Sequence, residues 1–185
     1  MPSLSINGES SFARSQQEEE VQTRQFLTFL LGEEMFAMPI DDIREIIEFS
    51  SLTEVPLMPN FLRGVINLRG SVVPVIDLSV RFGRTPTIIA RRTCIVIMEV
   101  TQDEQTLLLG VMVDAVRTVL TVENEKIEPP LSFGAKLRAD FIEGMINVKD
   151  HFIVVLDVGA VLSVEELSTL IGMAVAEEFN APSAS

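Results

Sequence analysis

The chain has 185 residues, a formal net charge of −13, 47% hydrophobic residues and a mean hydropathy of +0.34. This length and apolar content allow one good core or two small ones, which excludes an intrinsically disordered protein. The acidic excess argues against nucleic acid as a partner, and no apolar run reaches the ~18 residues of a membrane span. With a single cysteine, Cys94, the composition predicts a cytoplasmic protein without direct membrane insertion.

The first quarter of the chain is predicted to hold a tail, a β-hairpin and a short helix. Residues 1–22 are polar and include three consecutive glutamates, so we expect a flexible acidic tail. Two apolar segments of strand length, 25–31 and 35–38, flank a turn and predict the hairpin. Within 41–48 the isoleucines recur at the i, i+3, i+4 spacing of one helix face, which predicts the helix.

The stretch 61–78 carries the clearest pattern in the chain. Two short apolar strands, 65–68 and 72–76, flank a turn at Arg69-Gly70. A glycine there can take a positive φ that a β-carbon would penalise. Asp77 ends the second strand and is expected to cap a short helical turn.

The second half of the chain is predicted to continue with strands and to end with a helix. Three further segments have strand length and composition: 93–100, 106–113 and 116–122. The stretch 123–139 holds a Pro-Pro pair and predicts a long loop. A Ser-x-x-Glu capping box at Ser163 and Glu166 marks the start of a C-terminal helix, 163–178, followed by a frayed tail, 179–185.

The pattern of 61–78 returns later in the chain. Six positions are identical at a constant spacing of 80 residues: Phe61/Phe141, Gly64/Gly144, Ile66/Ile146, Asn67/Asn147, Val75/Val155 and Asp77/Asp157. A weaker echo at a spacing of 73 relates 41–47 to 114–120. Strings such as V-I-V-D also arise by chance in β-rich chains, but identity at Gly, Asn and Asp in register favours an internal duplication. We therefore expect a mainly β fold of two related barrels, the first over 38–90 and the second over 23–37 plus 91–162.

No residue pattern in the sequence is typical of catalysis or of metal binding. His151, the one histidine, falls at a predicted turn and is expected to be exposed. Cys94 has no nearby His or second Cys and is expected to be a buried, inert thiol. Asp77 and Asp157 could form a pair of carboxylates, but capping of the turns that follow explains them better. Phosphate-binding glycine loops and metal-ligand spacings are missing, so we expect a non-enzymatic binding protein without a cofactor or a metal.

Basic residues in polar positions are the candidates for binding. Arg69 lies at a predicted hairpin tip, where no core requires it; a binding role and a solubilising turn charge explain it equally well. Basic residues also cluster further on: Arg81, Arg84, Arg91 and Arg92. For that cluster a solvated loop face is the favoured interpretation.

The run Gly64-Val-Ile-Asn-Leu-Arg-Gly70 followed by Val73-Pro-Val-Ile-Asp-Leu78 closely resembles the CheW family of chemotaxis coupling proteins. The resemblance implies a CheW-like domain over 23–170, built from two SH3-like five-stranded barrels with partly exchanged segments. It also implies a non-enzymatic adaptor that joins the cytoplasmic tips of chemoreceptors to the regulatory domain of the histidine kinase CheA. The second turn, 149–152, lacks the usual Asp-Gly and departs from the family pattern.

The resemblance also assigns binding residues. Seven of them would line or support a receptor groove between the barrels: Ile43, Glu45, Gly64, Asn67, Arg69, Val116 and Val119. Three would contact the kinase: Ile46, Leu52 and Val72. We further expect Ile43, Val116 and Val119 to form one continuous apolar surface between the barrels.

Three alternatives to this function stay open at the level of sequence. The adaptor could serve a pathway that controls pili or development instead of flagella. The chain could be the CheW-like half of a larger protein, although it has no ATP-binding glycines or phosphotransfer histidine. A β-barrel enzyme or carrier would need a deep polar pocket, for which the sequence offers no candidate.

Overall fold

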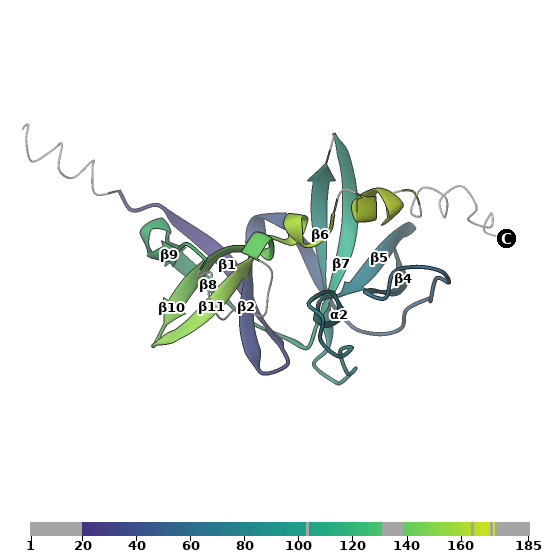
Figure 1. Cartoon of the computed structure of the whole chain (residues 1–185), viewed down its shortest axis with the longest axis horizontal. Helices are drawn as coiled ribbons and strands as arrows, with labels where there is room; N and C mark the ends of the chain where they lie inside the picture. Colours follow the sequence, from purple (N-terminus) through teal and green to yellow (C-terminus); the bar gives the residue numbers. More distant parts are fainter. Residues whose placement is uncertain (1–19, 103, 131–138, 164, 171, 173–185) are drawn as a thin grey trace, which may run out of the picture.

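The computed structural model describes residues 20–102, 104–130, 139–163, 165–170 and 172, and these residues form two sheets that lie next to each other (Figure 1). The first sheet has the strand order β8 (Ala115–Glu123), β1 (Thr23–Leu31), β2 (Glu34–Pro39), β11 (His151–Leu156), β10 (Ile142–Val148) and β9 (Ile127–Glu128). The second has the order β3 (Ile43–Glu48), β6 (Cys94–Gln102), β7 (Gln105–Val113), β5 (Ser71–Asp77) and β4 (Leu62–Leu68). The short helical segments are η1 (Ile40–Asp42), α2 (Leu78–Arg81), η2 (Asn124–Lys126), η3 (Ala139–Phe141) and α3 (Val158–Val161).

Each sheet joins a hairpin to strands from a distant part of the sequence. The β1–β2 hairpin pairs with β8 on one side and with β11 on the other, whereas β3, β4 and β5 join the β6–β7 hairpin. The predicted exchange of segments is therefore confirmed. The predicted boundary between the barrels is wrong, because 94–113 belongs with 43–77 rather than with the second barrel. A parallel ladder between β5 and β7, with Val75 opposite Gly110, makes that connection.

The two hairpins of the predicted duplication have the same geometry. Gly64 lies opposite Val75 in the β4–β5 hairpin, and Gly144 lies opposite Val155 in the β10–β11 hairpin, with the same register shift one residue before. Asp77 is the last residue of β5, and Asp157 directly follows β11. The Asp77 amide donates to the Phe61 carbonyl at 2.7 Å, and the Asp157 amide donates to the Phe141 carbonyl at 2.9 Å. These matches confirm the duplication.

The two turns are also alike, although their sequences differ. Arg69 and Gly70 have φ of 53° and 90°, and Lys149 and Asp150 have φ of 49° and 66°. Two consecutive positive φ values define the type I′ turn that suits the twist of a hairpin. The second turn therefore has the same form as the first without a glycine.

The helix predicted over 41–48 is wrong. The segment starts as the single 3-10 turn η1 and continues as strand β3, in which half-buried and exposed residues alternate. β-Branched isoleucines favour a strand that packs on one face. A register shift between Ile43 and Glu45 puts Ile43 and Ile46 three residues apart on one face, which imitates helical spacing.

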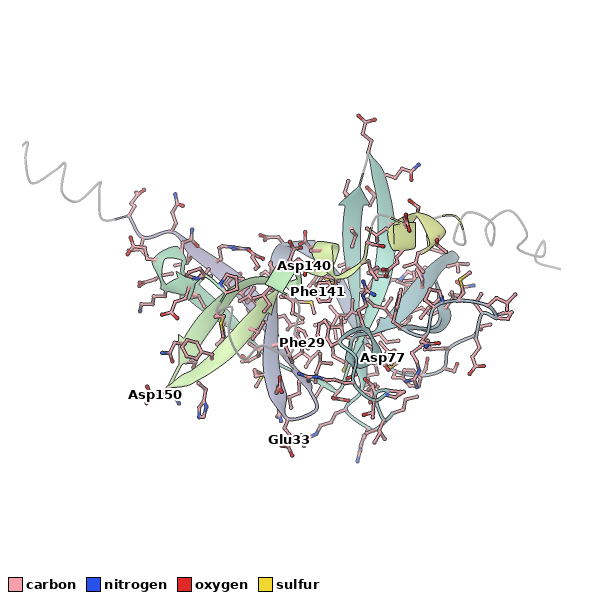
Figure 2. All side chains as sticks on the ribbon, viewed as in Figure 1. Phe29, Glu33, Asp77, Asp140, Phe141 and Asp150 are labelled. Atoms are coloured by element: carbon pink, nitrogen blue, oxygen red, sulfur yellow. The ribbon has the colours of Figure 1, made fainter. Side chains whose placement is uncertain are left out.

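Three apolar clusters hold the fold together. The interior of the six-stranded sheet contains Phe26 and Val155, and that of the five-stranded sheet contains Val73 and Ile97. The largest, called here the central cluster, lies between the sheets and draws on both, with residues such as Phe29 and Met98. Figure 2 shows Phe29 and Phe141 in this central region. Burial of whole Leu, Ile and Phe side chains contributes about 1.5–3 kcal/mol each, so the central cluster ties the two halves into one unit.

Arg81 joins the C-terminal helix to the central cluster. Its guanidinium lies 5.1 Å and 5.5 Å from the ring centres of the duplicated pair Phe61 and Phe141. Its Nε donates to the Val161 carbonyl at 2.7 Å, and its terminal nitrogen donates to Glu166 at 3.1 Å. Only 18% of this side chain is exposed, so the solvated position predicted for it is wrong.

The capping box at the start of the C-terminal helix is confirmed. The Glu166 amide donates to the Ser163 hydroxyl oxygen at 3.1 Å, and residues 165–170 and 172 are helical. The remainder of the predicted helix and the tail 179–185 lie outside the described residues, as does the predicted N-terminal tail up to residue 19. Among the described residues, no helix combines the length and the apolar content needed to cross a membrane.

Candidate functional site

The edge strand β8 carries a bulge that turns two valines to the same side. Val116 lies opposite Phe29, and Val119 lies opposite Leu27. Between these two pairs β8 contains one residue more than β1, which is the extra residue of the bulge. Directly opposite residues of an antiparallel pair project from the same face of the sheet. Val116 and Val119 therefore both face the side of Phe29 and Leu27, which belong to the central cluster.

The other edge strand, β3, repeats this arrangement. Ile43 lies opposite Met98 and Ile46 lies opposite Val96, with the register shift between them. Met98 and Val96 belong to the central cluster, against which Ile43 packs. Ile43 and Ile46 thus correspond to Val116 and Val119 both in the sequence echo and in their place on the sheet.

The two edge strands approach each other at Cys94. Glu48, at the end of β3, lies opposite Cys94, and the backbone amide of Val116, near the start of β8, is close enough to the Cys94 thiol to lower its pKa. The thiol itself donates to the Arg92 carbonyl at 3.3 Å. Ile43 and Val116 are half-buried against the central cluster. Ile46 and Val119 are 42% and 48% exposed. All four residues lie on the central-cluster side of an edge strand, and we call them together (Ile43, Ile46, Val116 and Val119) the apolar strip. That they form one continuous surface stays a prediction.

A salt bridge lies at the open end of the five-stranded sheet. The guanidinium of Arg69 donates to both carboxylate oxygens of Glu45, at 3.0 Å and 3.1 Å. It borders a shallow depression of about 500 Å³, whose apolar floor includes Leu68 and Ile97. Asn67 shapes the turn that carries Arg69, because its side-chain oxygen accepts the Gly70 amide at 2.8 Å. Arg69 is thus held across the sheet opening, with 78% of its side chain exposed.

The remaining predicted residues are mainly internal. Gly64 is buried, and Leu52 is half-buried against the interior cluster of the five-stranded sheet. Val72 lies opposite Asn67 and packs against the central cluster. The ten predicted residues therefore separate into the apolar strip, the Glu45–Arg69 opening and internal positions. The three predicted kinase contacts are spread over these groups, and Ile46 belongs to the strip.

The match to a known family decides how this arrangement is interpreted. A sequence model described as the CheW-like domain matches residues 25–166. The chain belongs to the CheW-like family. The matched region contains both edge strands of the apolar strip and both hairpins of the duplication.

Individual relatives agree with this assignment. The chain is similar to the chemotaxis protein CheW of Klebsiella aerogenes, at 30% identity over 78% of this chain and 85% of that protein. It is also similar to the probable chemotaxis protein CheW of Rhizobium etli, at 33% identity over 77% and 90%. The crystal structure of the scaffolding protein TtCheW from Thermoanaerobacter tengcongensis superimposes with a TM-score of 0.70 at 31% identity, covering 80% of this chain and 93% of that one.

Asp42 borders a depression of about 250 Å³, which is also lined by Val158 and Gly159 of α3. Burial raises the pKa of Asp42, and the charges of Asp41, Asp157 and Glu143 raise it further. Arg24 opposes this rise and pairs with Glu143 at 2.6 Å. Among the described residues, no group of three or more His, Cys, Asp or Glu side chains could hold a metal ion.

Sequence reasoning missed several exposed apolar residues. The largest of them outside the strip are Leu57, Ile88, Ile89 and Phe152. Leu57 is fully exposed, and its backbone adopts a left-handed φ of 63°. The sequence carries no signal that singles it out, since Val55 and Met58 in the same loop pack against the central cluster.

Cys94 is half-buried rather than buried, and its reactivity is expected to be low. Burial raises the pKa of its thiol, Glu48 adds to the rise, and the Val116 amide opposes it. Because the thiolate is the reactive form, alkylation by iodoacetamide at pH 8 should be at least about fivefold slower in the folded chain than in urea. The folded state retains the proton more tightly, so this contribution to stability is present below the unfolded pKa and is lost as the pH rises through the folded pKa. Equal alkylation rates in the two states would contradict this expectation.

Proposed function

We propose that this chain is a non-enzymatic adaptor that couples chemoreceptor tips to the histidine kinase CheA in a chemotaxis signalling assembly. Its CheW-like family and the scaffolding protein among its structural relatives support this function. The relatives named above are chemotaxis proteins, which favours this pathway over pili or development.

The apolar strip is the proposed receptor site. The observation that carries this proposal is the pair of bulged edge strands, which expose the equivalent residues Ile46 and Val119 beside one cluster. Exposed large apolar side chains that gather on one surface commonly mark a protein interface. An amphipathic receptor helix would place its apolar face on such a strip, with anchors spaced at i, i+3 and i+4.

The kinase site is proposed on the loop that contains Leu57. Leu52 and Val72 are half-buried against the chain's own clusters, so they offer a partner less apolar surface than the fully exposed Leu57. Leu57 lies in the same loop as Leu52, between β3 and β4, and its side chain is completely exposed. Its backbone adopts a left-handed conformation. Strain of this kind costs about 1–3 kcal/mol and often occurs at binding sites. Leu52 would then support the loop from inside.

Reciprocal substitutions test this assignment. Val119→Asp or Ile46→Asp is expected to weaken binding to a receptor-tip fragment at least about thirtyfold, because the helix would bury an unpaired carboxylate. The same variants should bind the CheA regulatory domain within about twofold of wild type. Leu57→Asp should weaken binding to the CheA regulatory domain and leave receptor binding within about twofold of wild type. Calorimetry with each partner measures the two affinities. All three positions are exposed, so thermal unfolding should change little.

Two results would contradict the proposal. Receptor binding that survives both strip substitutions would exclude the strip as the receptor site. Loss of both partners in a variant that keeps its melting temperature would show that the two sites are not separate.

Arg69 and Glu45 are proposed to border the receptor site as a pair. Because an exposed salt bridge contributes about 0.2–1 kcal/mol, Arg69→Ala should leave stability nearly unchanged. If the salt bridge holds the β4–β5 tip in place for the receptor, Arg69→Glu alone should weaken receptor binding about tenfold, and Arg69→Glu with Glu45→Arg should restore it. Receptor binding by the exchanged pair as weak as that of Arg69→Glu would instead assign a direct receptor contact to Arg69.

A further inference from the structure

The loop between α2 and β6 presents apolar side chains within a basic segment. Residues 84–92 contain three arginines and no acidic residue, in a chain with a net charge of −13. Ile88 is 83% exposed and Ile89 is 47% exposed. Arg91 and Arg92 are exposed as well. No residue of this loop belongs to the apolar strip or to the Glu45–Arg69 opening.

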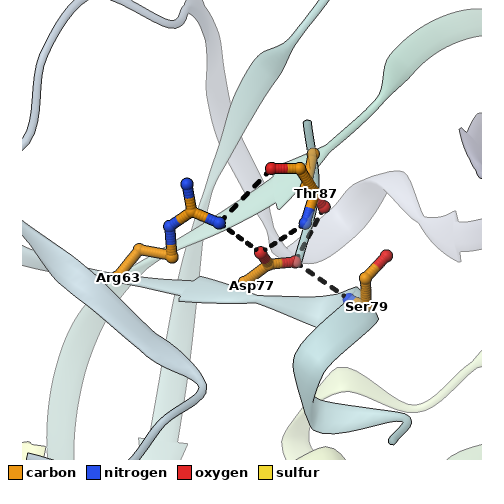
Figure 3. Close-up of polar contacts among 4 residues, drawn as sticks. All are labelled: Arg63, Asp77, Ser79 and Thr87. Atoms are coloured by element: carbon orange, nitrogen blue, oxygen red, sulfur yellow. Dashed lines mark hydrogen bonds and ion pairs between the residues drawn. The ribbon is translucent and has the colours of Figure 1, made fainter. Parts of the chain in front are cut away.

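A buried polar network fixes the loop immediately before the two isoleucines (Figure 3). The Thr87 amide and hydroxyl donate to the two carboxylate oxygens of Asp77, at 2.9 Å and 2.8 Å. Arg63 donates to the same carboxylate at 2.9 Å and to the Thr87 carbonyl at 3.3 Å. Asp77 is fully buried and Thr87 is 5% exposed. The network therefore fixes the position of Thr87, from which the exposed residues Ile88 and Ile89 continue.

A second anchor follows directly after the isoleucines. The Ala90 amide donates to the Thr93 hydroxyl oxygen at 2.8 Å, and the Thr93 amide donates to the Ala90 carbonyl at 3.2 Å. Thr93 is 2% exposed. Ile88 and Ile89 thus lie between two anchors in a loop of defined shape. A preorganised loop loses little conformational entropy when it binds a partner.

The charges next to the isoleucines are available to a partner. Arg84 donates to Glu34 at 2.8 Å, but the ion pairs of the described residues include neither Arg91 nor Arg92. Folding gains nothing from the exposure of two isoleucines, since their transfer out of water is favourable. A partner with carboxylates around an apolar patch would complement both features.

We propose that the loop 84–92 is a docking site for an acidic segment of a partner protein whose apolar side chains cover Ile88 and Ile89. Carboxylates of that segment pair with Arg91 and Arg92, and charge-assisted hydrogen bonds of arginine set its orientation. An anionic bilayer is a poorer occupant, because an extended negative surface would repel the acidic chain as a whole. A second copy of this acidic chain is disfavoured for the same reason. The site is independent of the receptor and kinase sites proposed above.

Site-specific photo-cross-linking of the full chain in the cells that produce it tests this proposal. p-Benzoylphenylalanine replaces Ile88, and a control chain carries it in place of Phe152, whose 45% exposure resembles that of Ile89. We expect an adduct from position 88 to a segment of another protein with more Asp and Glu than Lys and Arg. Adding Arg91→Glu with Arg92→Glu should reduce this adduct at least fivefold, while adducts from position 152 and the melting temperature stay unchanged.

The captured segment is then synthesised as a peptide, and its binding to the full chain is measured by fluorescence anisotropy. Ile88→Ser with Ile89→Ser should weaken binding at least tenfold, and so should Arg91→Glu with Arg92→Glu. The proposal is overturned if position 88 gives no adduct, or an adduct to lipid, to residues 1–19 of this chain or to a second copy. A basic or neutral captured segment, or an adduct that is insensitive to the arginine reversal, would overturn it equally.

Discussion

Gly64→Ala is expected to lower the free energy of unfolding by about 2–4 kcal/mol, because the position combines a steric clash with backbone strain. A β-carbon there would lie 2.5 Å from the Thr53 carbonyl oxygen and 3.1 Å from the Leu52 β-carbon. The Gly64 φ of 155° is also one that L residues rarely adopt. Thr53 and Val65 exchange backbone hydrogen bonds of 2.9 Å and 2.8 Å, so Thr53 cannot withdraw without breaking them.

The internal duplication supplies the matched control for this substitution. A β-carbon at Gly144 would lie 2.8 Å from a methyl group of Ile127 and 3.0 Å from the Glu128 carbonyl oxygen, without a positive φ. A side-chain methyl moves more easily than a backbone carbonyl, so Gly144→Ala should cost less than Gly64→Ala. Urea unfolding measures both variants, with the open helical position Gly172 as the reference. A Gly64→Ala protein within 0.5 kcal/mol of wild type would show that the 52–60 loop can move away.

This geometry changes the role of Gly64 from that of a contact residue to that of a support. Its buried position holds Thr53 and Leu52 against β4, and the loop that follows carries the exposed Leu57. Loss of partner binding on substitution of Gly64 would therefore reflect a displaced loop. Binding measurements on such variants are informative only beside a measurement of stability.

The duplicated hairpin could be predicted from sequence because its signals are local. Gly64, Asn67 and Asp77 each meet a local backbone requirement: a close approach, a turn and a helix cap. Their counterparts Gly144 and Asp157 meet the same requirements. Residues chosen for local backbone geometry leave a pattern that a repeat makes visible. The register and the turns of both hairpins follow from that pattern.

The partition of strands between the sheets could not be predicted in the same way. Whether β7 pairs with β5 or with a strand of the other sheet depends on contacts between distant parts of the chain. Apolar strands of similar composition fit either sheet. A β-carbon at Gly110 would lie 2.9 Å from a methyl group of Ile95 and 3.0 Å from one of Val75. This glycine therefore indicates the pairing only once its neighbouring strands are known. The predicted boundary between residues 90 and 91 is wrong for this reason.

The apolar strip depends on a feature that hydrophobic periodicity misrepresents. A bulge in a strand places residues i and i+3 on one face, and a helix does the same. The hydroxyl of Thr28 in β1 bonds both backbone groups of Thr118, the residue within the β8 bulge. It donates to the Thr118 carbonyl at 2.8 Å and accepts from the Thr118 amide at 3.0 Å. In the sequence, the signal for this bulge is a threonine, Thr28, within the otherwise apolar stretch 26–31 of β1. Without the partner strand its meaning cannot be assigned.

Asp77→Ala is expected to lower the free energy of unfolding by about 3–5 kcal/mol, since it removes the buried partner of a part-buried ion pair together with the acceptor of three further hydrogen bonds. The Asp77 carboxylate is fully buried and accepts from Arg63, from Thr87 twice and from the Ser79 amide at 3.0 Å. Alanine would leave these donors without an acceptor, each at a cost of about 1–3 kcal/mol before relaxation. The 84–92 loop would lose its first anchor at the same time.

The duplicated residue Asp157 is the control for Asp77. It is exposed and caps α3 by accepting the Ala160 amide at 3.2 Å, so Asp157→Ala should cost only about 1 kcal/mol. The cost should be smaller still because the negative charge of Asp157 raises the pKa of Asp42, and its removal relieves that repulsion. Denaturant unfolding at pH 7 compares the two variants, and hydrogen exchange of the Ala90 and Thr93 amides reports on the loop. Equal losses of stability at the two positions would show that the buried network adds nothing to the cap, since capping is the one role the two aspartates share.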